Sequence, residues 1–501
     1  MSVLGTMSPA AGLSRPGNPD RQPQSQSSEP ALTRSVLYLA YFFPPRGGAA
    51  VQRSLKFARY LPQFGWRPLV VANGGATVSQ DNATKVQDPT LLDELPECAV
   101  VRYTTLTGEE KRDYDRAQSR WRQRLNVTDP MGWWCGPAVR AGMELVKEYK
   151  PQAIVVTMSP FSAARCGVEL KRRTGLPLVI DLRDPWALDE TRIYPTRWHG
   201  SRDWVAMSKA LAAADLVVMN TPQSAVSVAE EFANEIQGRG DACPSKVIAI
   251  TNGFDGSDFG QSGHEQPPAP RDVLRIVHTG MFHSELAEVW DDVLAGRGFM
   301  NRLKHPRRPI NLWTRTPRYL LEAMDLAVKR GDIPDGKLEL VLVGELTGRD
   351  REMVDRAAVA TMVKMLGYRT HAESVAWLES ADLLFLPNHT PLDGGPTLVV
   401  PGKTYEYLGS GRPILAMCPK GDMQDFVQAS KSGIVTGGQD VNAAADALVK
   451  FYRAKQEGRT ILQPDRAIIE RFERRELTRK LAEGLDELVA TTAKARAAGS
   501  A

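Results

Sequence analysis

A lysine and a glutamate stand one helical turn apart in VVPGKTYEYLGSGRPILA, residues 399–416. Lys403 and Glu406 follow an apolar run and a glycine, which predicts that they lie at the start of a short helix after a strand. A lysine there can reach a phosphate as a point charge, and a carboxylate can accept two hydrogen bonds from a ribose diol. The alternative is an ion pair on the helix surface, which contributes only about 0.2–0.5 kcal/mol.

Glycines follow several predicted strands. Gly47 and Gly48 come after the first strand of the chain, and Gly280 and Gly344 follow two later ones. Glycine lets the backbone approach a phosphate or a sugar at a helix N-terminus, although a plain tight turn would explain the same residues. Arg315 precedes another predicted helix, where a guanidinium and backbone N–H groups can bind a diphosphate together; the alternative is a solvated arginine.

Charged residues crowd the end of another buried strand in the stretch VIDLRDPW. Asp181, Arg183, Asp184 and Trp186 all fall within six residues there. Charged side chains at such a position cost free energy unless they are paired or used. The stretch therefore predicts either a functional cluster or a structural pair between Arg183 and Asp184 that shapes the loop.

Short apolar runs alternate with amphipathic stretches along most of the chain. The runs that predict buried strands are 35–41, 68–72, 153–157, 176–182, 215–220 and 246–250, then 273–280, 338–344, 382–387, 413–417 and 432–437. This alternation is typical of α/β folds and predicts two tandem Rossmann-like domains, each with a doubly wound parallel sheet. Ligands of such sheets bind outside the carboxyl ends of the strands, where the loops described above are expected.

The composition of the chain changes at the predicted domain boundaries. We expect a disordered tail at 1–33, an N-terminal domain at 34–255, a linker at 256–272, a C-terminal domain at 273–470 and a helix at 471–501. The tail is rich in Ser, Pro, Gln and Gly, and the linker in Gly, Pro and Ser. Residues 284–313 interrupt the second domain after its first strand and are predicted to be an inserted loop or lid.

Charge and cysteine content exclude several classes of protein. The 63 basic residues nearly balance the 59 acidic ones, so nucleic acid is not expected as a partner. The five cysteines lie far apart without a CxxC pair, which indicates a reducing, cytoplasmic compartment. No apolar run reaches the roughly 18 residues that span a bilayer. HExxH and GxGxxG motifs are absent as well, so we expect no bound metal and no cofactor.

Two further patterns lie between 111 and 134. Asp113-Tyr114-Asp115 matches the DxD letters of metal-dependent transferases, but its charged surroundings predict an exposed helix. Basic and aromatic residues are also interleaved there: Lys111, Arg112, Arg116, Arg120, Arg122 and Arg124 with Trp121, Trp133 and Trp134. This combination suits peripheral contact with an anionic inner-membrane surface or a lipid-linked acceptor. The alternative is a solvated helix whose tryptophans pack inward.

Seven stretches then occur in a characteristic order. They are YFFPPRGGAAVQRSLKFARYLPQFGWRPLVV, TDPMGWWCGPAVRAG, VIDLRDPW, ADLVVMNTPQSA, ITNGFD, SADLLFLP and PGKTYEYLGSGRPILA. Together they resemble the retaining GT-B glycosyltransferases of the glycogen-synthase-like group, in particular the family 4-like bacterial branch that builds surface polysaccharides. The resemblance runs from about 35 to 475. It implies two Rossmann-like domains facing a cleft, with donor bound mainly to the C-terminal domain, acceptor to the N-terminal domain, and the C-terminal helix crossing back.

The resemblance also implies roles for individual residues. Glu406 would bind the donor ribose, Lys403 and Arg315 would lie near the diphosphate, and Gly47 and Gly48 would approach the donor. Gly280 and Gly344 would border the same donor site. Asp184 lies near the position where many members carry a histidine or aspartate facing the acceptor, with Arg183 and Trp186 beside it.

One position departs from the family pattern. Many members have a second glutamate eight residues before Glu406, where it touches the donor sugar, and this chain has Leu398. Asp393 lies nearby but does not simply replace it.

The activity implied is transfer of a sugar from a nucleoside diphosphate sugar to a glycan or lipid-linked acceptor, with retention, in polysaccharide or glycoconjugate biosynthesis. In such members the leaving diphosphate is thought to take the acceptor proton, so the protein supplies positioning and charge stabilisation. Two alternatives stay open. A nucleotide-sugar 2-epimerase shares the fold but needs more ionisable residues in the cleft. A non-catalytic nucleotide-sugar binder or assembly partner is favoured by Leu398.

Overall fold

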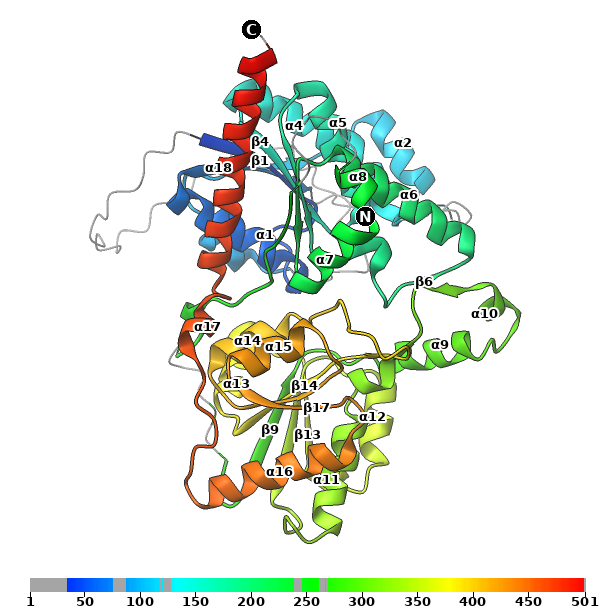
Figure 1. The fold of residues 1–501 in the computed structure, drawn as a ribbon, viewed down its shortest axis with the longest axis vertical. Helices are drawn as coiled ribbons and strands as arrows, with labels where there is room; N and C mark the ends of the chain where they lie inside the picture. Colours follow the sequence, from blue (N-terminus) through cyan, green and yellow to red (C-terminus); the bar gives the residue numbers. More distant parts are fainter. Residues whose placement is uncertain are drawn as a thin grey trace, which may run out of the picture.

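The computed structural model describes residues 34–74, 87–117, 119, 128–237, 246–260, 266 and 269–499. Two α/β domains are stacked along the longest axis of the molecule, and each is built on a parallel sheet (Figure 1). The tail predicted at 1–33 and part of the linker predicted at 256–272 lie outside the described residues.

The first sheet has the strand order β3-β2-β1-β4-β5-β7-β8. Its strands are β1 (Arg34–Ala40), β2 (Trp66–Asn73), β3 (Val100–Thr104), β4 (Ala153–Met158), β5 (Leu178–Leu182), β7 (Leu216–Met219) and β8 (Lys246–Ala249). All the pairings are parallel. In β1, Leu37 and Leu39 pack into the core on one face of the sheet. Val36 and Tyr38 pack into the core on the opposite face. Burial on both faces explains why these strands read as continuous apolar runs.

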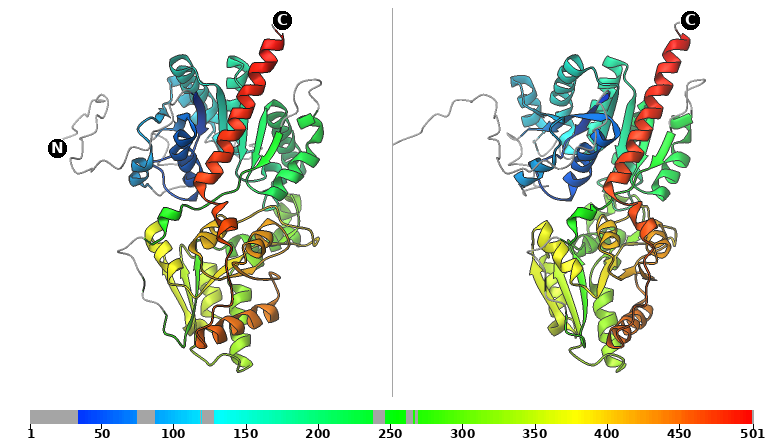
Figure 2. Two further views of the ribbon diagram at one scale, coloured as in Figure 1. Left: turned by 60° about the vertical axis from the view of Figure 1, so that its left-hand side comes forward. Right: turned by 90° about the vertical axis from the view of Figure 1, so that its left-hand side faces the viewer.

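Helices cover both faces of the first sheet. They are α1 (Ala49–Tyr60), α2 (Gly108–Ala117), α4 (Cys135–Tyr149), α5 (Ala164–Thr174), α6 (Arg197–Ala213), α7 (Pro222–Glu231) and α8 (Ala233–Gln237). Helix α18 (Arg474–Gly499) comes from the end of the chain and runs along the outside of this domain (Figure 2). Its apolar residues Leu477, Leu481 and Leu485 are buried in the same core as Val36. The last helix is thus a structural part of the N-terminal domain.

The second sheet has the order β13-β12-β9-β14-β16-β17 and is also parallel. Its strands are β9 (Leu274–Thr279), β12 (Leu338–Val343), β13 (Val363–Gly367), β14 (Leu383–Pro387), β16 (Ile414–Met417) and β17 (Gly433–Thr436). The helices around it are α11 (Arg318–Lys329), α12 (Gly348–Asp355), α13 (His371–Glu379), α14 (Lys403–Ser410), α15 (Asp422–Ala429), α16 (Val441–Gln456) and α17 (Arg466–Glu470). Two tandem Rossmann-like domains, as the sequence predicts, are confirmed.

The chain passes between the domains at two points that are bonded to each other. Phe254 N donates to Phe472 O at 3.2 Å, and Arg474 N donates to Phe254 O at 2.9 Å. The rings of Phe254 and Phe472 are both buried in the core of the second domain. The two crossings therefore form one short, hydrogen-bonded connection.

The segment predicted to be an insertion forms a second link between the domains. It contains α9 (Ser284–Leu294), α10 (Phe299–Leu303), β10 (His305–Pro306), β11 (Ile310–Asn311) and the 3₁₀ helix η8 (Leu312–Arg315). β10 pairs with β6 (Ile193–Tyr194) of the first domain, and β11 pairs with β15 (Thr390–Pro391) of the second. The segment is thus an ordered bridge and not an isolated loop.

Among the described residues, no helix is both long and apolar enough to cross a bilayer.

Candidate functional site

Two glycines bring neighbouring strand ends of the second domain into close contact. Gly280 follows β9 with φ +99°, and Gly344 follows β12 with φ +138°. A Cβ on Gly344 would lie 2.7 Å from the carbonyl oxygen of Gly280, which is closer than a carbon atom can approach without displacing it. Only glycine fits at Gly344, and its left-handed backbone also favours glycine. At the carboxyl ends of β9 and β12 the backbone is therefore not covered by side chains of these two residues; we call this the glycine edge.

Lys403 lies directly against this edge. Its Nζ is 2.8 Å from Nε2 of His278, and a Cβ on Gly280 would lie 3.1 Å from the same Nζ. The hydroxyl of Tyr407, one turn further along α14, accepts the N–H of Thr279 at 2.9 Å. That bond fixes the start of α14 to the end of β9 and so positions Lys403.

The environment of Lys403 lowers its affinity for a proton. Burial and the positive charge of Arg315 lower its pKa to about 7, while Glu406 opposes the shift. Burial and the charge of Lys403 hold the pKa of His278 well below its usual range. His278 is therefore neutral: Nδ1–H donates to the carbonyl of Phe385 at 2.9 Å, and Nε2 is free to accept from Lys403.

Arg315, at the end of η8, is the second cation near this edge. It is half-buried, and within the described part of the chain it makes neither a hydrogen bond nor an ion pair. Burial lowers its pKa to about 10, and Asp189, Asp184 and Glu190 oppose the shift. His283 lies in the same field, since burial and the charge of Arg315 lower its pKa to about 3. A cationic site with spare hydrogen-bond donors suits an anionic ligand.

Glu406 does not form the surface ion pair with Lys403 that one interpretation of the sequence predicts. The half-buried carboxylate has neither an ion pair nor a hydrogen bond to any described residue. Its negative charge opposes the lowering of the pKa of Lys403 and contributes to the raised pKa of His371. Its acceptor oxygens are therefore available to a ligand.

The first domain contributes a loop and a helix start. Gly48 begins α1 with φ +89°, and no atom lies within 4 Å of the position that a Cβ would take; Gly47 beside it is buried. Arg183 donates to the carbonyl of Ala50, which joins the loop after β5 to the start of α1. Asp184 follows in that loop.

Asp184 is electrostatically coupled to the second domain. Loss of water around the carboxyl raises the pKa of Asp184, as does the charge of Asp189, while Arg183 and then Arg315 oppose the shift. Asp184 and Arg315 come from different domains, so this coupling spans the boundary between them.

The prediction that Trp186 faces an acceptor is wrong. Its side chain is only 2 % exposed, its Nε1 donates to Asp203 at 2.9 Å, and its ring stacks on Phe161 at 5.2 Å. Trp186 belongs to the core of the first domain. A large apolar ring at a strand end packs inward because burial removes its surface from water.

A buried carboxylate that the sequence does not predict joins the two domains. Glu190 of the first domain accepts from Arg308 at 2.9 Å, from the backbone N–H of Leu398 at 3.1 Å, and from Thr397. It also bonds His389 Nε2 at 2.7 Å. Glu190 is fully buried, and its pKa is lowered because the bonds from His389 and Thr397 outweigh the effect of burial. No local pattern could reveal it, since its partners lie more than 100 residues away.

The sequence predicts that the stretch 111–134 exposes both basic and aromatic side chains, and the described part exposes the basic ones. Helix α2 is exposed, including Lys111, Arg112 and Arg116. Trp134 is buried, its Nε1 donates to Thr104 at 3.1 Å, and Trp133 packs edge-on against Tyr114. Both tryptophans pack inward, so for them the alternative interpretation holds. Trp121, Arg120, Arg122 and Arg124 lie outside the described residues.

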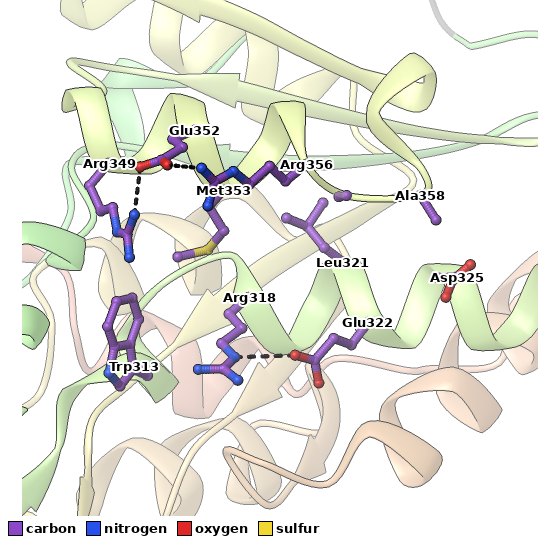
Figure 3. A pocket seen from close by; sticks show the side chains of 11 residues that line it. Trp313, Arg318, Leu321, Glu322, Asp325, Arg349, Glu352, Met353, Arg356 and Ala358 are labelled. Atoms are coloured by element: carbon purple, nitrogen blue, oxygen red, sulfur yellow. Dashed lines mark hydrogen bonds and ion pairs between the residues drawn. The ribbon is translucent and has the colours of Figure 1, made fainter.

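A separate cavity of about 490 Å³ opens between α11 and α12 (Figure 3). Arg318, Arg349 and Arg356 line it, but Glu322 pairs with the first and Glu352 with the other two. None of the residues considered above lines this cavity. Because its cations already have carboxylate partners, it is a weaker anion site than the edge beside Lys403.

Comparison with known proteins finds a sequence match in the second domain. Residues 310–454 match the family described as Glycosyl transferases group 1. A 111-residue stretch, 22% of the chain, is 28% identical to WcaL of Salmonella typhimurium, a protein assigned to colanic acid biosynthesis as a glycosyltransferase. The match covers 27% of the length of that relative.

Solved structures share the architecture of the whole chain. Sucrose-phosphate synthase of Thermosynechococcus elongatus superposes with a TM-score of 0.58 and 12% identity, over 91% of this chain and 99% of that one. HepE of Anabaena, solved in complex with UDP, superposes with a TM-score of 0.52 and 16% identity, over 91% of this chain and 100% of its own.

These likenesses show the fold, and the sequence match covers the part of the second domain that holds Arg315, Gly344, Lys403 and Glu406. The chain thus has the GT-B fold, and its residues 310–454 match the Glycosyl transferases group 1 family.

Proposed function

We propose that the protein transfers a sugar from a nucleoside diphosphate sugar to a glycan or lipid-linked acceptor, with retention at the anomeric carbon. The observation that carries this proposal is the pair of cations, Lys403 and Arg315, beside the glycine edge of the second domain. A donor presents a diphosphate, and its departure leaves negative charge that two nearby cations stabilise.

The remaining residues take roles around this pair. Gly280 and Gly344 let the backbone approach the diphosphate, and Glu406 accepts hydrogen bonds from the donor ribose. Asp184 faces the acceptor from the other domain and orients its hydroxyl. The leaving diphosphate takes the acceptor proton, so the protein mainly orients the reactants and stabilises charge.

The base and the pathway are proposed from the relatives. HepE was solved with UDP, so UDP-sugars are the first donors to test. The assignment of WcaL favours an acceptor in polysaccharide biosynthesis.

The test is release of nucleoside diphosphate from common nucleotide sugars, with and without added glycan or lipid-linked acceptors. We expect slow release from one donor alone and faster release with its acceptor. Lys403→Met should abolish the acceleration, whereas Lys450→Met, at an exposed position of α16, should not. Absence of release with every donor and acceptor, together with absence of donor binding, would refute the proposal.

A nucleotide-sugar 2-epimerase is the second candidate. More ionisable residues are coupled to the site than the sequence reveals, because Asp189 acts on Asp184, and His278 and His283 lie in the field of Lys403 and Arg315. An epimerase would convert the donor to its 2-epimer without an acceptor. Proton NMR of the donor distinguishes the two activities. A binder without catalytic activity would retain the donor and yield neither product.

A further inference from the structure

Helix α10 is the tip of a hairpin that projects from the side of the molecule, level with the domain boundary (Figure 1). Gly296 and Gly298, with φ +60° and +83°, turn the chain between α9 and α10. None of the five residues of α10 is buried. The hairpin therefore presents α10 to its surroundings.

The tip is apolar. Phe299 is 75% exposed, Met300 67% and Leu303 47%, and the first two are the most exposed large apolar side chains in the described ranges. Their spacing of i, i+1 and i+4 places the three on one face of α10. Scattered apolar residues on a surface need no explanation, but a contiguous group marks a contact with another apolar body.

The surroundings of the tip are basic. Residues 293–321 contain seven lysines and arginines and no aspartate or glutamate. Arg302 and Lys304 flank Leu303, and Arg302 is exposed. Within the turn, Arg297 pairs with Asp292 at 3.1 Å. The acidic residues of the tip region lie on α9, and the apolar face of α10 itself is flanked by the basic side chains of Arg302 and Lys304.

The first domain adds exposed apolar and basic residues next to the hairpin. Helix α10 ends two residues before β10, and α6 begins three residues after β6, the strand that pairs with β10. At that start of α6, Trp198 is 53% exposed, and Arg197 and Arg202 are also exposed. Apolar and basic residues of both domains therefore flank the same two-stranded ribbon.

We propose that Phe299, Met300 and Leu303 insert into the interface of an anionic lipid bilayer, with Arg302, Lys304 and the start of α6 binding its headgroups. Apolar side chains ringed by lysine and arginine suit the boundary between acyl chains and anionic phosphates. A second copy of the chain fits less well, because three side chains offer far less than the roughly 800 Å² per partner of a stable dimer. This inference goes beyond the proposed transferase activity and does not depend on it.

The first test uses the full chain in flotation with neutral phosphatidylcholine vesicles and with vesicles containing 30 mol% (about one lipid in three) phosphatidylglycerol. The protein should float with the anionic vesicles at low salt and much less at high salt or with neutral ones. Phe299→Ser with Met300→Ser should reduce the bound fraction by at least about tenfold, and Arg302→Gln with Lys304→Gln by roughly tenfold. Val226→Ser with Tyr368→Ser removes exposed apolar surface elsewhere and should float like the parent.

Three outcomes would overturn the proposal. The first is absence of flotation of the parent protein under every condition. The second is loss of binding in Lys111→Gln, Arg112→Gln, Arg116→Gln but not in the hairpin variants, which would move the contact to α2. The third is a dimer in light scattering that Phe299→Ser with Met300→Ser converts to monomer, which would identify a second copy as the occupant. Donor binding by the hairpin variants should equal that of the parent, so failure here is separable from failure of the transferase proposal.

Discussion

Burial of Lys403 and the positive charge of Arg315 make the charge of this lysine sensitive to pH near neutrality. With a pKa of about 7 in the free protein, Lys403 is charged below that pH and becomes neutral above it. A bound diphosphate would favour the charged form, so donor binding should take up a proton above pH 7.

We therefore expect the Kd for a nucleoside diphosphate sugar to rise with pH, by up to about tenfold per unit above pH 7. The sugar-linked diphosphate has no group that titrates in this range, which leaves Lys403 as the source. Calorimetric titration at pH 6, 7, 8 and 9 measures it. Lys403→Met should bind weakly with a flat pH profile; an equally steep profile in that variant would assign the effect to another group.

Glu406 gives the second prediction at this scale. Glu406→Gln keeps the shape but loses charge-assisted hydrogen bonds of about 1.5–3 kcal/mol, so donor affinity should fall about ten- to a hundredfold. Folding should be unaffected, because the carboxylate has no bonded partner among the described residues. Glu285→Gln, at an exposed position in the first turn of α9, is the matched control in the same titration. Parental affinity in both variants would mean that the ribose lies elsewhere.

The limits of sequence interpretation are clear for single residues. The glycines and Lys403 follow strands, and the rule that parallel strands end at one edge brings them together. The sequence leaves two interpretations open for Trp134, and it does not reveal that the ring of Trp186 is buried, because residue type alone does not say which way a ring points. Glu190 has no local signal, since its function depends on contacts with Arg308 and His389 across the domain boundary.

At the scale of elements, the strands of the two large sheets that the sequence does not predict are β3 and β13. Both are edge strands of their sheets, and most of their residues are only half-buried. Arg102 interrupts β3 and Lys364 interrupts β13, so neither forms the continuous apolar run of a central strand. The interior strands are predictable because both of their faces are buried.

The Glu190 cluster makes a prediction at the same scale. Glu190→Ala leaves Arg308 and His389 without their buried partner, which typically costs about 3–5 kcal/mol. We expect a lower midpoint in urea unfolding and a larger radius of gyration in solution scattering, because the loop from β14 to α14 loses its bonds to Glu190. The loop keeps those that Leu398 O accepts from the first domain, such as the bond from Ser224. Asp393→Asn removes the exposed partner of the same arginine and should cost only about 0–1 kcal/mol. Equal effects of the two exchanges would show that the buried carboxylate does not hold the domains together.

At the scale of the whole molecule, two domains that contribute to one site should be stabilised by a ligand that contacts both. A nucleoside diphosphate at a hundred times its Kd should stabilise the folded protein by about 2.7 kcal/mol. A thermal melt in the presence of each common nucleoside diphosphate measures this as a rise in Tm. The Lys403→Met variant at the same concentration should show a much smaller rise. An unchanged Tm with every nucleotide would count against a donor site between the domains.

Two of the connections between the domains lie on opposite sides of the molecule; a further contact is made by α7, where Ser224 donates to the carbonyl of Leu398. The paired crossings at Phe254 and Phe472 lie near α17, on the left in Figure 1, and the β6–β10 ribbon that follows Glu190 lies on the right. The crossings are a pivot with one narrow point of attachment. A rotation there of a few degrees moves the far side by the full width of the domain times the angle. The bonds of Glu190 lie far from the pivot, so a given force there exerts the largest torque against opening. Opening the molecule would therefore begin at the ribbon, and the last point to move would be the pivot.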